Sequence, residues 1–206
     1  IRVLTHEIMN TVTPIASLSS ALSQNLDAYD TEDVRSALGT ISSSSEGLIS
    51  FVQSYRSLTH IAAPVRKAFY LRDLVNDSVT IAQANWPSAR VSYHELSEDI
   101  ILYADYGQIS QVMNNLIKNA VQAGASDIDI TASIDKRERT VINVANNGEP
   151  ISETGREQIF VPFYTTKGVS GTGVGLSLCR QIIRLNGGTI NLTSSTHEAT
   201  VFTIVL

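Results

Sequence analysis

The spacing of apolar residues changes near Pro64, and this change divides the chain into two parts. Before it, apolar residues recur every seven positions in two series: Ile1, Ile8, Ile15 and Leu22, then Val34, Ile41, Leu48 and Tyr55. A seven-residue repeat gives each helix one apolar stripe, as in a coiled coil. We therefore expect residues 1–62 to form a helical hairpin and residues 63–206 to form a separate domain.

The stretch NLDAYDTED, residues 25–33, interrupts the repeat and marks the turn between the two helices. Thr31 is the predicted N-cap of the second helix, with Glu32 and Asp33 in its first turn, where carboxylates interact favourably with the helix dipole. A lone two-helix hairpin leaves much of its apolar stripe exposed. Two copies packed as a four-helix bundle would cover that stripe, so we expect a homodimer.

Beyond residue 63 the pattern alternates between helical and strand-like segments. Pro64 cannot continue a helix, so residues 59–67 are expected to form a linker. The predicted helices and strands follow in this order: helix 71–84, strands 91–94 and 100–103, helix 106–123, strands 127–134 and 140–146, helix 174–185, and strands 188–194 and 199–206. Closely spaced strands suggest hairpins. The fold class is therefore α+β, in which the helical hairpin is followed by an α/β sandwich with helices on one face of a mixed sheet.

Composition excludes several kinds of partner. The chain has 15 Lys and Arg against 20 Asp and Glu, a net charge of −5, so no basic surface is available for a nucleic acid. Cys179 is the single cysteine, which fits a reducing compartment. No apolar run reaches the roughly 20 residues that span a bilayer. Because the chain starts at Ile1 without Met, we expect a cytoplasmic fragment that makes no membrane contact itself, with any membrane anchor or sensor part upstream.

A glycine-rich segment precedes the last predicted helix. Its sequence is GVSGTGVGLSLCRQIIRLNGG, with glycines at Gly168, Gly171, Gly173 and Gly175. Glycines allow close approach of the backbone to a ligand, and the free N–H groups at a helix start favour phosphate oxygens. The spacing fits neither a P-loop nor a dinucleotide-binding loop. On its own, this segment is also compatible with a flexible loop or with close packing of the helix on the sheet.

Four further motifs accompany the glycine loop. They are THEIMNTVTP with His6, NNLIKNAVQA with Asn115 and Asn119, VANNGEPI with Gly148, and IFVPFYTTKG with Phe160 and Phe163. Taken alone, the two asparagines could be solvated polar residues of a helix. Together and in this order, the five motifs resemble the phosphoacceptor, asparagine, first glycine, phenylalanine and second glycine boxes of two-component sensor histidine kinases, whose ATP-binding domain is of the GHKL type.

The resemblance implies ATP and Mg²⁺ as ligands of the second domain. It assigns Mg²⁺ to Asn119 and a place near the phosphates to Asn115. The residues expected around ATP are completed by Asn146, Gly148, Lys167, Gly171, Thr172, Gly173, Gly175, Leu176 and Thr200. Residues 149–170 would form a lid over the nucleotide, with Phe160 and Phe163 anchoring it. For Lys167 a solvated loop charge, and for Thr200 ordinary strand propensity, are about equally good explanations.

Two positions depart from the family pattern. Asn146 stands where the family usually has an Asp that accepts a hydrogen bond from the adenine amino group. The amide oxygen can accept the same bond without charge assistance. Since a neutral hydrogen bond contributes only about 1 kcal/mol net, we expect weaker ATP binding rather than its loss. Gln122 replaces a basic residue that the family often has, so one phosphate contact would be missing.

His6 is the residue whose chemistry the resemblance identifies. A zinc site of the HExxH type requires a second histidine at position 10, where the chain has Asn10. The resemblance implies instead that His6 is phosphorylated by ATP, that Glu7 orients its imidazole, and that the phosphoryl group passes to an Asp of a response regulator protein. Asn10 matches the position that orients a water for hydrolysis of that phospho-Asp, so phosphatase activity is a hypothesis.

Two other functions remain open from the sequence. Asn146 and Gln122 are compatible with a catalytically weak, pseudokinase-like scaffold that binds a response regulator. A GHKL ATPase of another kind, such as a chaperone or a serine-directed kinase, lacks a histidine box on a dimerising hairpin. The sensor histidine kinase core is the interpretation that accounts for all five motifs.

Overall fold

The computed structural model describes the chain except residues 1, 25–28 and 167–172, and except the side chains of residues 2–7. The chain forms two compact units. The first is built on Ile1–His60, and the second on Ile61–Tyr164 and Gly173–Leu206. Each unit has its own secondary structure, and the nucleotide motifs that the structure describes all lie in the second.

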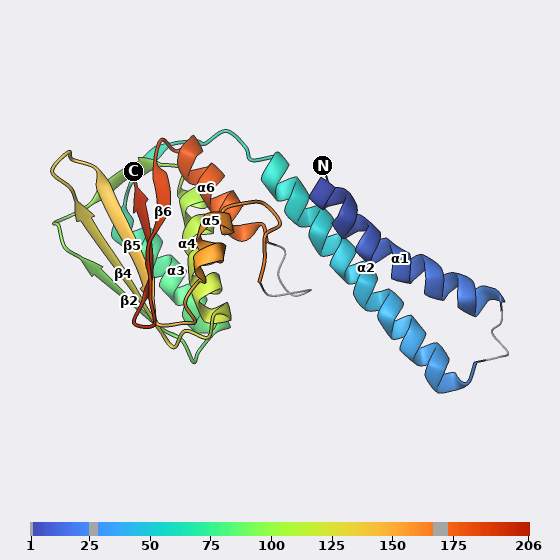
Figure 1. Ribbon diagram of the computed structural model, residues 1–206. Helices are drawn as coiled ribbons and strands as arrows, with labels where there is room; N and C mark the ends of the chain where they lie inside the picture. The colour runs from blue at the N-terminus through green and yellow to red at the C-terminus, as the bar shows by residue number, and fades with distance from the viewer. Residues whose placement is uncertain (1, 25–28, 167–172) are drawn as a thin grey trace. The chain divides into compact units, whose positions relative to one another are not determined.

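The first unit is a hairpin of two long helices (Figure 1). Helix α1 spans Arg2–Gln24 and α2 spans Thr31–Thr59, as the seven-residue repeat predicts. The N-cap of α2 is Asp30, not Thr31, so that prediction was wrong by one residue. Asp30 Oδ1 accepts hydrogen bonds from the main-chain N–H groups of Glu32 and Asp33, both at 2.8 Å. A carboxylate at this position satisfies two N–H groups and also interacts with the helix dipole.

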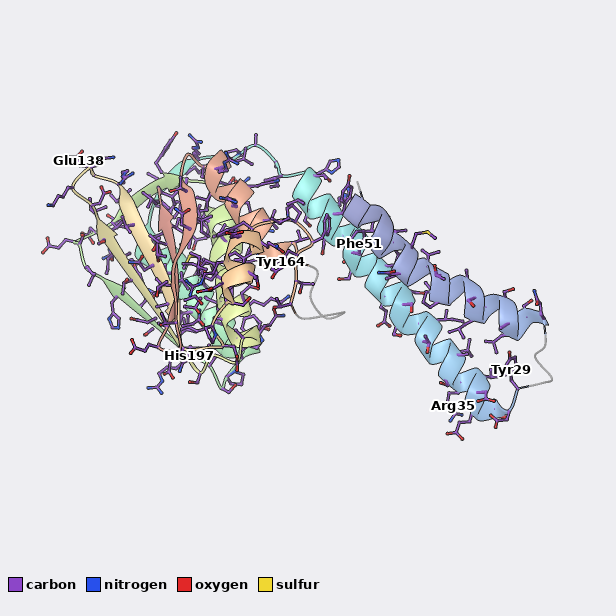
Figure 2. All side chains as sticks on the ribbon, in the orientation of Figure 1. Tyr29, Arg35, Phe51, Glu138, Tyr164 and His197 are labelled. Atoms are coloured by element: carbon purple, nitrogen blue, oxygen red, sulfur yellow. The ribbon has the colours of Figure 1, made fainter. Side chains whose placement is uncertain are left out.

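Apolar side chains remain exposed on both helices of the hairpin. Phe51 is buried in α2 (Figure 2), whereas several other apolar residues of the hairpin are exposed: Met9, Val12, Leu38, Ile49, Val52 and Tyr55. A single copy of the hairpin therefore leaves apolar surface in water, as expected from its sequence. Among the described residues, no helix has both the length and the apolar character needed to cross a bilayer.

A five-stranded mixed sheet forms the centre of the second unit. Its strands are β2 (Arg90–Glu95), β4 (Asp127–Ile134), β5 (Thr140–Asn146), β7 (Thr200–Val205) and β6 (Thr189–Ser195), in that spatial order. The β2–β4 pair is parallel and the other pairs are antiparallel. Helices α3 (Leu71–Asn85), α4 (Tyr106–Gln122) and α6 (Gly175–Leu185) cover one face (Figure 1). This is the predicted α/β sandwich.

Alternating burial along the strands explains the single covered face. In β5 the side chains of Ile142 and Val144 are buried while Val141, between Thr140 and Ile142, is only half-buried. Helix α4 places Met113 and Leu116 on its buried side. Strand residues two apart and helix residues three or four apart point the same way, so these two periodicities meet in one core.

Three features differ from the sequence prediction. Strand β1 (Lys67–Tyr70) pairs antiparallel with β3 (Ile101–Ala104) in a separate two-stranded sheet. Strands β2 and β3 therefore do not form the expected hairpin, and β2 pairs with β4 instead. Helix α5 (Glu153–Gln158) lies in the stretch predicted as a polar loop. Strand partners depend on distant residues, and a six-residue helix is too short to show a helical period.

Candidate active site

Helix α4 directs two asparagines toward the start of α6. The N-cap of the helix is Asp105, whose Oδ1 accepts a 3.0 Å hydrogen bond from the N–H of Gln108. A Cβ atom placed on Gly175, the first residue of α6, would lie 3.7 Å from Asn115 Oδ1 and 3.9 Å from Asn119 Nδ2. The structure therefore places the predicted asparagine pair beside one predicted phosphate-binding glycine.

The first turn of α6 is a candidate site for an anion. Its N-cap residue is Val174, which offers no side-chain hydrogen bond to the N–H groups that follow. Uncapped N–H groups at a helix start carry partial positive charge and bind anionic oxygens. Leu176, also predicted near ATP, is the second residue of this turn and is half-buried. The geometry at the start of α6 fits a phosphate group.

Gly173 closes the loop that precedes α6. Its φ is +63°, and its carbonyl oxygen accepts a 2.8 Å hydrogen bond from the N–H of Phe163. A Cβ atom on Gly173 would lie 2.5 Å from the main-chain carbon of Phe163. Both the backbone conformation and the close approach therefore require glycine at this position.

The loop after β5 packs against the end of α4. Glu149 donates its N–H to the carbonyl oxygen of Ala123 at 2.8 Å, and a Cβ atom on Gly148 would lie 2.9 Å from the same oxygen. Ala123 is the C-cap of α4 and bonds back to Asn119. Gly148 is therefore held one helical turn from Asn119, which joins the first glycine motif to the asparagine motif.

Asn146 and Thr200 face each other in the sheet and are both buried. The Asn146 amide nitrogen donates to the Thr200 carbonyl oxygen at 3.3 Å, and Asn146 Oδ1 accepts from the N–H of Gly148 at 3.1 Å. The Thr200 hydroxyl lies 2.8 Å from Ser195 Oγ. An amide oxygen has two lone pairs, so Asn146 retains capacity for one more donor.

Ser195 was missed by the sequence analysis. Its hydroxyl accepts a 2.8 Å hydrogen bond from the N–H of Ile151 as well as contacting Thr200. It thereby links the loop after Gly148 to the end of the sheet, where His197 marks the β6–β7 turn (Figure 2). No sequence motif identified it, because a serine at a strand end has no distinctive spacing.

The predicted lid anchors have different surroundings. Phe160 packs edge-to-face on Phe202 of β7, with ring centroids 6.3 Å apart. Phe163 has a left-handed φ of +67°, rare for a bulky side chain. The packing of Phe160 on the sheet is what an anchor requires, while Phe163 contributes through its main chain.

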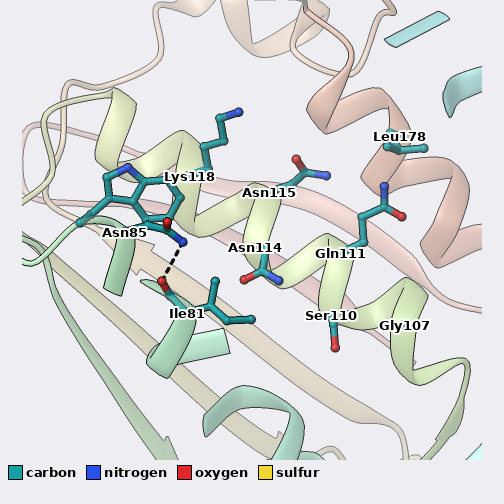
Figure 3. A pocket seen from close by; sticks show the side chains of 10 residues that line it. Ile81, Asn85, Gly107, Ser110, Gln111, Asn114, Asn115, Lys118 and Leu178 are labelled. Carbon is teal, nitrogen blue, oxygen red and sulfur yellow. Dashed lines mark hydrogen bonds between the residues drawn. The ribbon is translucent and has the colours of Figure 1, made fainter. Parts of the chain in front are cut away.

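A cavity of about 550 Å³ lies on the outer side of α4 (Figure 3). Of the predicted ATP residues, Asn115 lines it, together with Lys118 of α4, Trp86 after α3 and Leu178 of α6. Asn119, Asn146, Gly148 and Thr200 do not line it. The cavity therefore does not enclose the predicted nucleotide site, which is defined by the contacts among its own residues.

The described residues support neither a metal site built from His, Cys, Asp and Glu nor a cysteine nucleophile. In that part of the chain, no group of three or more His, Cys, Asp or Glu residues could hold a metal ion. A Mg²⁺ ion that accompanies a nucleotide would instead use the amide oxygen of Asn119, a hard donor that Mg²⁺ accepts. Burial raises the pKa of the Cys179 thiol to about 12, so this cysteine is not a nucleophile at neutral pH.

Several of the predicted site residues have side chains outside the described part of the chain. Lys167, Gly171 and Thr172 lie outside the described residues. The structure describes the main chain of His6 and Glu7 as part of α1, but it does not describe their side chains. Asn10 is exposed on the same helix, one turn after His6.

Comparisons with known proteins identify the family of the second unit. The family described as histidine kinase-, DNA gyrase B-, and HSP90-like ATPase matches residues 104–206. The catalytic domain of histidine kinase ThkA is 33% identical, with a TM-score of 0.61, and the match covers 68% of this chain and 94% of that one. The structure of ThkA in complex with the response regulator TrrA gives 26% identity and a TM-score of 0.72, over 98% of this chain and 59% of that one.

A curated relative extends the similarity over both units. Sporulation kinase D of Bacillus subtilis (strain 168) is 27% identical over 205 residues, which cover 98% of this chain but 40% of that protein. The chain therefore corresponds to less than half the length of this kinase.

Proposed function

Since the chain belongs to the histidine kinase-, DNA gyrase B-, and HSP90-like ATPase family, as the catalytic core of a two-component histidine kinase, we propose that it phosphorylates His6 with Mg-ATP. The observation that carries this proposal is that the side chains of Asn115 and Asn119 both face Gly175 at the start of α6, within 4 Å of where a Cβ atom of that residue would lie. In the proposed division of labour, residues 63–206 bind the nucleotide and residues 1–62 carry the phosphoacceptor and the dimer interface.

The chain's own residues give each part of the nucleotide a place. The uncapped N–H groups at the start of α6 receive the phosphate oxygens, with Gly171, Thr172, Gly173 and Lys167 proposed to complete that surface. Asn146 and Thr200, buried at the end of the sheet, receive the adenine. Asn119 would hold Mg²⁺, which supplies positive charge against the phosphate oxygens when bound.

The proposed reaction transfers one phosphoryl group. A ring nitrogen of neutral His6 attacks the γ-phosphorus, a nitrogen–phosphorus bond forms, and the bond to the bridging oxygen breaks to release ADP. Glu7 accepts the N–H of the other ring nitrogen, which fixes the tautomer and stabilises the positive charge that develops on the imidazole. Such a reaction needs positioning and charge neutralisation more than covalent chemistry by other residues.

A response regulator is the proposed acceptor of the phosphoryl group, and a second copy of the chain is the proposed partner of the hairpin. ThkA, a similar kinase, has been solved in complex with the response regulator TrrA. The exposed apolar residues of α1 and α2 support dimerisation, because a four-helix bundle would cover them. The single buried cysteine is compatible with work in the reducing cytoplasm.

Phosphate incorporation tests the proposal. The purified protein is incubated with γ-labelled ATP and Mg²⁺, and protein-bound label is tested for the acid lability and base stability of a phosphohistidine. We expect such label in the parent protein and in His60→Gln, a matched control with an exposed histidine at the end of α2, and no label in His6→Gln. Failure of the parent protein to take up label at millimolar ATP would favour the scaffold that Asn146 and Gln122 suggest.

Asn10 carries the proposed phosphatase activity. It is exposed on α1, one helical turn after His6, where an amide could orient a water toward a phospho-Asp of the regulator. In Asn10→Ala we expect regulator dephosphorylation to be lost while autophosphorylation of His6 continues. Unchanged dephosphorylation in this variant would remove Asn10 from the mechanism.

A further inference from the structure

A second cavity, of about 250 Å³, lies among α5, α6 and the edge strand β6. Arg156 and Glu157 of α5 line it, as does Phe160, which follows that helix. The rest of the lining is Arg180 of α6 and residues 191–195 of β6. Among the described residues proposed to bind ATP, none lines it. All of its lining residues belong to the second unit.

Arg180 lies over the ring of Phe160 at one side of the cavity. Its guanidinium carbon lies 4.9 Å from the ring centroid of Phe160, and Phe160 is itself packed on Phe202. A guanidinium group stacked on an aromatic ring keeps its N–H groups in the plane, at its edges, where they can donate to a planar or tetrahedral oxyanion. The stacking therefore orients Arg180 before any ligand arrives.

Arg156 reaches the cavity from the other helix. Its terminal nitrogen donates a hydrogen bond to the main-chain carbonyl oxygen of Ser195, at the end of β6. This contact fixes the position of the side chain and uses one of the five N–H donors of a guanidinium group. Arg156 and Arg180 thus bring donors to one cavity from two separate helices.

The charge of the cavity is positive. Within the described part of the chain, neither Arg156 nor Arg180 is in an ion pair, although Glu157 also lines the cavity. Two guanidinium groups therefore face a single carboxylate. The amide of Asn191 and the hydroxyl of Ser194 add neutral hydrogen-bonding groups to the lining.

We propose that this cavity binds a phosphate group, either as inorganic phosphate or as part of a small phosphate monoester. Two guanidinium groups with free edges match the tetrahedral oxygens and double negative charge of phosphate. At about 250 Å³ the cavity is smaller than the roughly 300–1,000 Å³ of typical ligand pockets, which favours a small phosphate compound as the occupant. Phosphate binding here is distinct from the proposed ATP binding, although Arg156, Glu157 and Phe160 belong to the stretch 149–170 proposed as the nucleotide lid.

Side-chain NMR of the arginines tests the site directly. Inorganic phosphate is titrated against the full chain at constant ionic strength while the Nε–H signals of Arg156 and Arg180 are followed. We expect both signals to shift saturably in the millimolar range, and a parallel titration with O-phosphoserine tells whether an ester is bound better than the free ion. No saturable shift, or an equal shift with succinate, would overturn the assignment of phosphate.

Variants separate this site from general charge effects. Arg180→Gln should weaken phosphate binding by about tenfold, the loss expected for one charge-assisted contact, and Arg180→Lys by less. Glu157→Gln should strengthen binding because it removes the opposing carboxylate. Arg184→Gln, a change on the same helix outside the cavity, and Asn119→Ala, in the ATP site, should leave the Arg156 shift unchanged. Weakening by Arg184→Gln equal to that by Arg180→Gln would show nonspecific attraction and contradict the proposal.

Discussion

The main-chain N–H of Phe163 donates a 2.8 Å hydrogen bond to the carbonyl oxygen of Gly173. This bond joins the chain at the end of the phenylalanine motif to the chain at the start of α6. Both residues have positive φ values, +67° and +63° respectively. The bond therefore ties Phe163, within the proposed lid of residues 149–170, to Gly173, two residues before α6 begins at Gly175.

Replacing Gly173 with alanine should disrupt this junction. The new Cβ would lie 2.5 Å from the main-chain carbon of Phe163, and alanine at φ +63° costs about 1 kcal/mol before the clash is counted. We expect Gly173→Ala to lower the free energy of unfolding by about 1–3 kcal/mol and to weaken ATP binding. Urea denaturation and calorimetric titration with ATP measure the two effects.

Gly39→Ala is the matched control for that substitution. Gly39 lies inside α2, and a Cβ atom there would meet nothing within 4 Å. Alanine is the better helix former by about 0.5–1 kcal/mol, so this variant should be slightly stabilised and should bind ATP as the parent does. Equal behaviour of the two variants would show that the Phe163–Gly173 contact has no special role.

Asn146→Asp should raise the affinity for ATP. The carboxylate keeps an acceptor for the N–H of Gly148 and offers the adenine amino group a charge-assisted bond, at the cost of the donor to the Thr200 carbonyl. We expect about fivefold tighter binding, since such bonds exceed neutral ones by about 1 kcal/mol, together with slightly lower stability. Calorimetry of both proteins decides the point, and weaker or unchanged binding in Asn146→Asp would refute the adenine role of this residue.

Asp105 connects the segment that contains Val65 to the start of α4. Its Oδ1 caps α4 through Gln108, and its Oδ2 accepts a 2.8 Å hydrogen bond from the N–H of Val65. These bonds lower the pKa of Asp105 from its ordinary value of 3.8, and the bond from Gln108 has the largest effect. On acidification, Asp105 is therefore protonated at a higher pH in the unfolded chain than in the folded protein. The stabilisation is complete above pH 3.8 and is lost as the pH falls toward the lowered pKa.

Two substitutions at Asp105 separate its contacts. Asp105→Asn keeps an N-cap acceptor for Gln108 and removes the acceptor for Val65, whereas Asp105→Ala removes both. We expect the alanine variant to lose about 1 kcal/mol more than the asparagine variant. Unfolding followed between neutral pH and pH 3 should show a shallower acid dependence in both variants, and an unaltered slope would exclude Asp105 as its source.

The periodic segments were predictable because their signal is local. The helix over residues 106–123 and the strand over residues 127–134 were predicted within one residue of their observed bounds. Strand β1 was not predicted, since four residues next to a proline carry little pattern and its pairing with β3 is set by distant contacts. The N-cap of α2 was misplaced because Asp30 and Thr31 are both good caps, and only the geometry shows which one reaches the N–H groups.

The candidate site was predictable through its motifs, and its connections were not. Asn115, Asn119 and Gly175 were selected from spacing and resemblance, and the structure places the two side chains beside the glycine. The role of Ser195, which ties Ile151 to Thr200, depends on a strand end meeting a loop from elsewhere in the sequence. No local sequence pattern indicates that these two segments lie side by side.

Locating the phosphoryl group on the chain tests the central claim most directly. The protein is phosphorylated with Mg-ATP, digested under neutral conditions that preserve phosphohistidine, and mapped by mass spectrometry with fragmentation that retains the modification. The account predicts one phosphoryl group, on His6, within the peptide that contains THEIMNTVTP. A phosphoryl group found on His60, His94, His197 or a hydroxyl side chain, with His6 unmodified, would contradict it.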